Sequence, residues 1–114
     1  MTELLIVTAL AMVLDVVTGV AGAVKSGTLM SGKMREGLWH KAGFCGLVAG
    51  AYLFEFAAGV ADLGIAIPAT GAVCVWVIVT EAVSVVENLC VLNPQIAESP
   101  IGKAFAAARK DADA

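Results

Sequence analysis

Three long apolar runs, separated by short polar segments, make up most of the chain. They cover residues 4–24, 42–61 and 68–92, and only glycines and a few polar side chains interrupt them. A helix needs about 20 mostly apolar residues to cross the hydrocarbon core of a bilayer. We therefore expect an all-α integral membrane protein whose single domain, residues 1–114, has three transmembrane helices.

The last segment, residues 93–114, is too polar to add a fourth crossing. Ser99 followed by Pro100 is a typical helix start, with a capping residue and then proline in the first turn. Apolar residues then share one face from Ile101 to Ala108, and basic residues lie opposite. This spacing predicts a short amphipathic tail helix on the membrane surface, and a frayed polar tail is the alternative.

Basic residues are confined to the segment after the first apolar run and to the tail. Lys and Arg favour the cytoplasmic side in short loops. Two crossings separate these segments, so both can lie in the cytoplasm with the amino terminus outside. We therefore predict a cytoplasmic loop at residues 25–41 and a cytoplasmic tail at residues 93–114, in N-out/C-in orientation. The predicted basic anchors at the membrane edge are Lys25, Lys33, Arg35 and Lys41.

The composition excludes several other classes of protein. Hydrophobic residues make up 60% of the chain and charged residues 15%, whereas a soluble domain is roughly half apolar and a quarter charged. The formal net charge of −3 disfavours nucleic-acid binding. Three scattered cysteines give neither a disulfide framework nor a zinc-binding pattern. We expect no catalytic site, no metal and no cofactor.

Each predicted span nevertheless carries at least one carboxylate, although a charge at the bilayer centre costs about 2.5–3.5 kcal/mol on insertion scales. Helical spacing gathers the polar and small residues of each span on one face. These faces either pack against one another in a three-helix bundle or line water in an assembly, and both can hold at different times. The polar stripes comprise Asp15 and Thr18, then Glu55, then Glu81, Ser84, Glu87 and Asn88.

Glycines mark further surfaces for helix contact. In the second span, Gly46 and Gly50 have the G-x-x-x-G spacing that allows two helices to approach closely. In the first span, small residues lie on the same face as Asp15. The predicted helix-packing residues are Gly19, Gly22, Gly43, Gly46 and Gly50.

Three short motifs lie on or beside the spans. They are Asp15-Val16-Val17-Thr18-Gly19, then Ser31 followed by Gly37-Leu38 and Lys41, then Glu81-x-x-Ser84-x-x-Glu87-Asn88. In order and spacing, over about residues 10–95, they resemble the D-x-x-T-G, S…G-L-x-x-K and E-x-x-S-x-x-E-N motifs of the phage holins of the toxin-secretion/phage-lysis type, holin family 4. After Asn88 the chain departs from the family, because Leu92-Asn93-Pro94 stands where a glycine and then a proline are expected.

The resemblance implies a protein of the bacterial inner membrane that oligomerises abruptly and opens that membrane at lysis. A cell-wall hydrolase, the phage endolysin, then reaches the peptidoglycan, and some relatives are linked to toxin release. The implied partners are membrane lipid, further copies of the chain and the endolysin. Two other functions stay open. A small proton-coupled transporter would use Asp15 but usually needs four spans, and an antiholin or structural membrane subunit would form no lesion.

Overall fold

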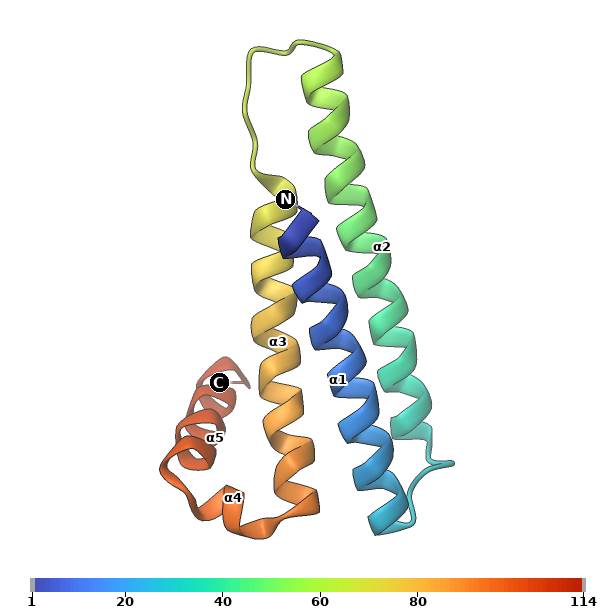
Figure 1. Ribbon diagram of the computed structural model, residues 1–114, viewed down its shortest axis with the longest axis vertical. Coiled ribbons are helices and arrows are strands. Elements are labelled where there is room, and N and C mark those ends of the chain that lie inside the picture. Colours follow the sequence, from blue (N-terminus) through green and yellow to red (C-terminus); the bar gives the residue numbers. More distant parts are fainter. Residues whose placement is uncertain (1, 114) are drawn as a thin grey trace.

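The computed structural model describes residues 2–113, which form helices and connections without any strand. Three long helices, α1 (Thr2–Ser26), α2 (Gly32–Val60) and α3 (Ala69–Leu92), run side by side, and α4 (Pro94–Glu98) and α5 (Pro100–Asp113) fold back beside α3 (Figure 1). Each long helix is long and apolar enough to cross a membrane. The predicted fold class, an all-α protein with three membrane-length helices, is confirmed.

The helix α2 begins at Gly32, well before the apolar run that starts at residue 42. Ser31 caps it, because the Ser31 hydroxyl accepts a hydrogen bond from the Met34 amide at 3.1 Å. Residues 32–41 contain no proline to stop the helix. The expected loop at residues 25–41 is therefore mostly helix, since the hydropathy pattern marks where lipid-compatible sequence begins and not where helical backbone begins.

The tail contains the predicted helix and a further short helix, α4, that the sequence analysis did not predict. The Ser99 hydroxyl accepts a hydrogen bond from the Gly102 amide at 3.1 Å, and α5 starts at Pro100. Gly102 lies so close to α4 that a Cβ atom there would be 2.0 Å from the Ile96 carbonyl oxygen. Only glycine permits this sharp connection between α4 and α5. The predicted amphipathic tail helix is present and packs beside α3.

The interior of the bundle lies mainly between α1 and α3. Each of these two helices has five buried residues, whereas Ala58 alone is buried among the residues described in α2. The least exposed positions in α2 alternate in steps of three and four, which is the spacing of a narrow helix–helix seam. The buried residues are Thr8, Asp15, Thr18, Gly22 and Ala23 in α1, and Thr70, Cys74, Val77, Glu81 and Val85 in α3.

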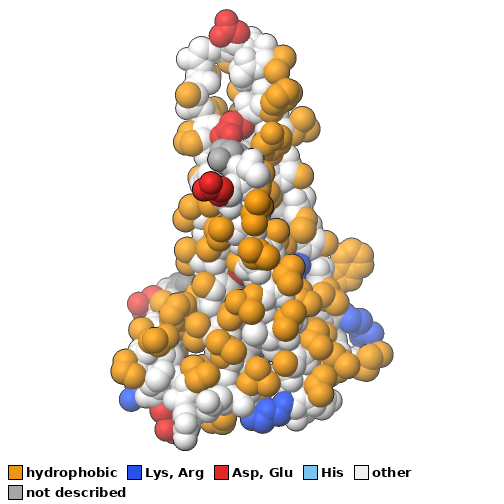
Figure 2. All heavy atoms as spheres, viewed as in Figure 1, with side chains coloured by type: hydrophobic (Ala, Val, Ile, Leu, Met, Phe, Trp, Pro, Cys, Tyr) orange, Lys and Arg blue, Asp and Glu red, His pale blue; other side chains and the backbone are white. Residues whose placement is uncertain are grey.

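The outside of the bundle is apolar. Hydrophobic side chains are spread over the whole face shown in Figure 2, and Lys and Arg side chains lie mainly in its lower part. Leu10, Val13 and Val17 on α1 are more than half exposed, on the side opposite the buried Asp15. Such a surface suits lipid rather than water, because a soluble protein rarely exposes a large contiguous apolar area.

Candidate functional site

One ionic cluster joins all three long helices. The Lys41 ammonium of α2 pairs with the Asp15 carboxylate of α1 and, at 3.1 Å, with the Glu81 carboxylate of α3. The side chains are 17%, 9% and 2% exposed, respectively. We call these three residues the Lys41 cluster. Removing one partner of such a buried group leaves an uncompensated charge, which typically costs about 3–5 kcal/mol.

Asn88 extends the cluster along the contact between α1 and α3. Its side-chain amide donates to Asp15 Oδ1 at 2.8 Å and to Thr18 Oγ1 at 3.0 Å. The Thr18 hydroxyl in turn donates to the Leu14 carbonyl at 2.8 Å. A Cβ atom at Gly19 would lie 3.4 Å from the Asn88 amide nitrogen, so this glycine lets the two helices approach. Polar side chains from two predicted stripes therefore meet inside the protomer.

Other residues of the predicted stripes lie apart from the cluster. Glu55 is half-buried on α2 and has no ion-pair partner in the described part of the chain. Glu87 is half exposed and pairs with Arg109 of α5. Ser84 is half-buried and lines the cleft described below. The three predicted stripes thus contribute unequally to the Lys41 cluster: Asp15 and Glu81 belong to it, whereas Glu55 does not.

The predicted packing glycines fall into two groups. Gly19 and Gly22 lie against α3, where a Cβ atom at Gly22 would be 3.5 Å from the Val91 side chain. Around Gly43, Gly46 and Gly50 nothing lies within 4 Å of an added Cβ atom. The glycine face of α2, Gly43, Gly46 and Gly50, is therefore exposed and makes no close contact with the other described residues.

The four predicted basic anchors have different surroundings in the structure. The Lys25 ammonium donates to the carbonyl oxygens of Val91 at 2.8 Å and Leu92 at 3.1 Å, which caps the end of α3. Lys33 and Arg35 are exposed. Lys41, expected at the membrane edge with the others, is instead inside the bundle. The sequence analysis did not predict this interior position, because Lys41 is the last polar residue before an apolar run. Its spacing from Phe44 and Val48, which matches the seam of α2, is the signal that could have indicated it.

The position of Lys41 fixes how α2 lies along the other helices. Asp15 and Glu81 are near the middle of α1 and α3, whereas Lys41 is in the first half of α2. The Phe44 and Trp76 rings, with centroids 5.3 Å apart, support the same register. The upper end of α2 consequently extends beyond α1 and α3 (Figure 1). The middle of the α2 apolar run is about ten residues past Lys41, whereas the middles of the other two runs are close to Asp15 and Glu81. At 1.5 Å per residue, the α2 run is therefore displaced along the bundle by about 15 Å relative to the other two.

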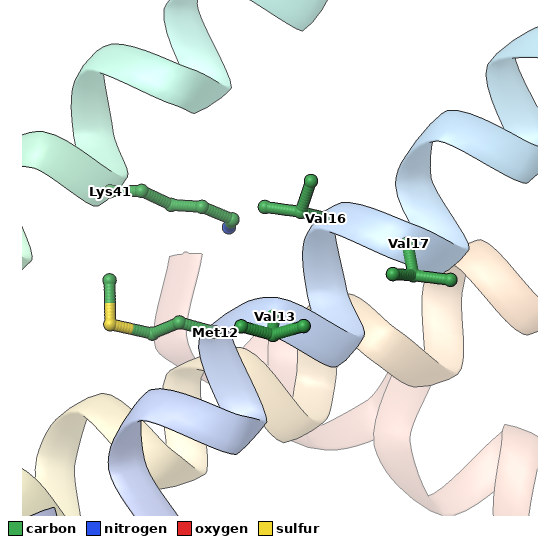
Figure 3. A pocket seen from close by; sticks show the side chains of 5 residues that line it. All are labelled: Met12, Val13, Val16, Val17 and Lys41. Carbon is green, nitrogen blue, oxygen red and sulfur yellow. The ribbon is translucent and has the colours of Figure 1, made fainter.

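Two hollows adjoin the cluster. A cleft of about 540 Å³, the polar cleft, extends from Asp15 and Lys41 to the connection between α1 and α2. An apolar groove of about 260 Å³ lies beside it, lined by residues of α1 together with Lys41. Figure 3 shows the Lys41 side chain reaching from α2 toward Val16 on α1. All three sequence motifs line the polar cleft. The residues are Asp15, Val16 and Gly19 from the first motif, Ser31, Gly37, Leu38 and Lys41 from the second, and Ser84, Glu87 and Asn88 from the third.

Comparison with known proteins identifies the family. A model of the bacteriophage holin family matches residues 1–105, a range that holds all three long helices and the Lys41 cluster. No curated protein and no solved structure matches the chain. The resemblance found in the three motifs is confirmed, and the family is one of pore-forming membrane proteins rather than of enzymes. The chain therefore belongs to the bacteriophage holin family.

Proposed function

We propose that this protein is a holin that accumulates in the bacterial inner membrane, oligomerises and permeabilises that membrane at lysis. The phage endolysin would then cross or become active. The observation that carries the proposal is the Lys41 cluster, in which charged side chains lie near the middle of α1 and α3. Charged residues inside membrane spans are rare, and they mark water-filled paths and ion or proton routes.

The closed protomer satisfies these groups internally. Asp15 is held by Lys41 and by Asn88, and Glu81 is held by Lys41. Asp15, Lys41 and Glu81 are therefore paired within the protein while copies are dilute. In an assembly, the same polar faces can line water instead, where the desolvation cost of a charge disappears. Packed and water-facing arrangements thus become two states of one protein.

The helix α2 is the element best suited to move between these states. It buries little and its apolar run is offset from those of α1 and α3 by about 15 Å, half of the roughly 30 Å bilayer core. Bringing the three runs level would withdraw Lys41 from Asp15 and Glu81. The two carboxylates would then need water or neighbouring copies, which favours assembly.

The orientation we propose is N-out/C-in. Lys25 near the end of α1 and Lys33 near the start of α2 lie beside the connection between these two helices, and Asp62 lies in the connection between α2 and α3 at the opposite end of the bundle. This distribution agrees with the preference of Lys and Arg for the cytoplasmic side. A cysteine at position 33, on a background without other cysteines, should resist an impermeant thiol reagent in intact cells and react after the membrane is opened. Labelling before lysis would contradict the orientation.

Inducible expression in a bacterium with a potential-sensitive dye tests the function itself. We expect a delay during which the protein accumulates in the inner-membrane fraction, then an abrupt loss of membrane potential and viability. Co-expressed endolysin should lyse the cells only after that loss. Full accumulation without any depolarisation would contradict the holin function and agree with an antiholin or a structural subunit.

A further inference from the structure

The polar cleft and the apolar groove form one amphipathic hollow beside α1 and α2, which α3 and α5 also line at the polar end. Both are lined by Val16 and Lys41, so they adjoin. Hydroxyl and charged side chains, among them Ser31 and Lys33, line the polar cleft near the α1–α2 connection, whereas Met12, Val13 and Val17 line the groove toward the middle of α1. A volume of about 540 Å³ is in the range of small-molecule sites, about 300–1,000 Å³.

The charges around the polar cleft favour an anion at its outer end. Asp15 is engaged by Lys41 and Asn88, and Glu87 is engaged by Arg109. Lys33 also lines the cleft, is exposed and has no carboxylate partner among the described residues. An unpaired ammonium at the outer end, with carboxylates already satisfied further in, suits a phosphate group.

Hydroxyl groups surround the same end of the cleft. The Ser31 hydroxyl accepts from the Met34 amide, so its own proton is available to a further acceptor. Ser26 and Thr28 also line the cleft, but they bond within the chain: the Ser26 hydroxyl donates to the Gly22 carbonyl at 2.9 Å and lies 2.9 Å from the Thr28 hydroxyl. Gly37 lines the cleft as well, and an added Cβ atom there would meet nothing within 4 Å. The space beside Ser31 is therefore open and is not filled by the protein's own packing.

We propose that this hollow binds one anionic phospholipid from the leaflet at the basic end of the bundle. The phosphate lies near Lys33 and Ser31, and an acyl chain lies along Met12, Val13 and Val17. A basic pocket between transmembrane helices is a known arrangement for anionic headgroups. The bound lipid bridges α1 and α2, and its binding does not depend on lesion formation.

Native mass spectrometry of the detergent-solubilised full chain tests the proposal directly. With phosphatidylglycerol or phosphatidylcholine of identical acyl chains, we expect one retained phosphatidylglycerol and at least fivefold weaker retention of phosphatidylcholine, on the scale of one charge contact near the membrane surface. Equal retention of the two lipids would overturn the anionic site. Displacement by glycerol phosphate at the same concentration as the lipid would overturn the role of the acyl chain.

Two variants, each with a matched control on α2, localise the site. Lys33→Gln should weaken phosphatidylglycerol retention about fivefold, whereas Arg35→Gln removes the same charge from a residue outside the cleft and should change it little. Gly37→Leu should fill the cleft and abolish retention, whereas Gly59→Leu, also free of neighbours within 4 Å, should not.

Circular dichroism separates loss of binding from loss of fold. If Gly37→Leu loses helix content, the comparison of Lys33→Gln with Arg35→Gln alone decides whether the lipid binds in this cleft. Equal effects of these two charge changes would show attraction to the general surface and would overturn the site.

Discussion

The α1–α3 pair and α2 are held together in different ways. α1 and α3 bury five residues each along their contact, and Asn88 and Lys25 add hydrogen bonds between them. α2 depends on Lys41 and on the Phe44–Trp76 ring contact, and Ala58 is the one residue it buries in the described part of the chain. The comparison indicates a closely packed two-helix unit and a third helix whose position depends on a few contacts, above all the Lys41 cluster.

Loss of Lys41 should have the largest effect on this division. Lys41→Met leaves Asp15 and Glu81 without their cation, and such a loss costs about 3–5 kcal/mol, or roughly 100-fold or more in the equilibrium that holds α2 in place. Crosslinking between cysteines placed at positions 44 and 76, on a background without other cysteines, measures that equilibrium. The same double-cysteine chain with Lys41 retained is the wild-type reference, because the two cysteines also remove the Phe44–Trp76 ring contact. We expect the yield to fall to background and lysis to begin early.

The matched control is Lys110→Met, which removes a lysine from the exposed surface of α5. Its crosslinking yield and lysis time should equal those of the wild type. An unchanged yield in Lys41→Met would show that α2 is retained by other contacts.

Leucine substitutions at one glycine of α1 and one glycine of α2 should have smaller effects than Lys41→Met, and they should differ from each other. Gly19→Leu places a side chain where a Cβ atom already lies 3.4 Å from Asn88, so it should separate α1 from α3 and lower accumulation in the membrane. Gly46→Leu meets nothing within the protomer, so accumulation should be normal. Because the glycine face is open to another copy, we expect Gly46→Leu to reduce crosslinked oligomers and delay lysis. Unchanged oligomers and timing would make this face ordinary lipid-exposed surface.

The tail should contribute least. Arg109 and Glu87 form an ion pair whose side chains are about half exposed, and exposed pairs typically contribute about 0–1 kcal/mol. Arg109→Gln should therefore leave the crosslinking yield between positions 44 and 76 within about fivefold of the wild type. A fall as large as that of Lys41→Met would show that α5 helps to retain α2.

Much of this architecture follows from local patterns. The apolar runs predict three helices because hydrocarbon requires backbone hydrogen bonds to close within each segment. Helical spacing places Asp15, Thr18 and Glu81 on interior faces, and Ser99 with Pro100 predicts the start of α5. These features depend on neighbours within a few residues, which a single sequence displays.

The role of Lys41 could not be predicted in the same way. Its partners are 26 and 40 residues away in the chain, and the contact depends on how far α2 is displaced along α1 and α3. The hydropathy pattern favours level apolar runs, whereas the ionic cluster enforces an offset. The hydrogen bond from Asn88 to Asp15 was missed for the same reason, since the pattern of one helix does not fix its register against another.

The central claim is that the carboxylates of the Lys41 cluster, Asp15 and Glu81, are needed for opening, whereas apolar side chains can replace the complete cluster in packing. The triple variant Asp15→Leu, Lys41→Met, Glu81→Leu tests it most directly, because replacing a complete buried ionic group with apolar residues is often neutral or stabilising by about 1–4 kcal/mol. Membrane-fraction protein levels and membrane potential are followed together after induction. We predict accumulation at least equal to the wild type without depolarisation or lysis. Normal accumulation followed by depolarisation at the wild-type time would contradict the claim.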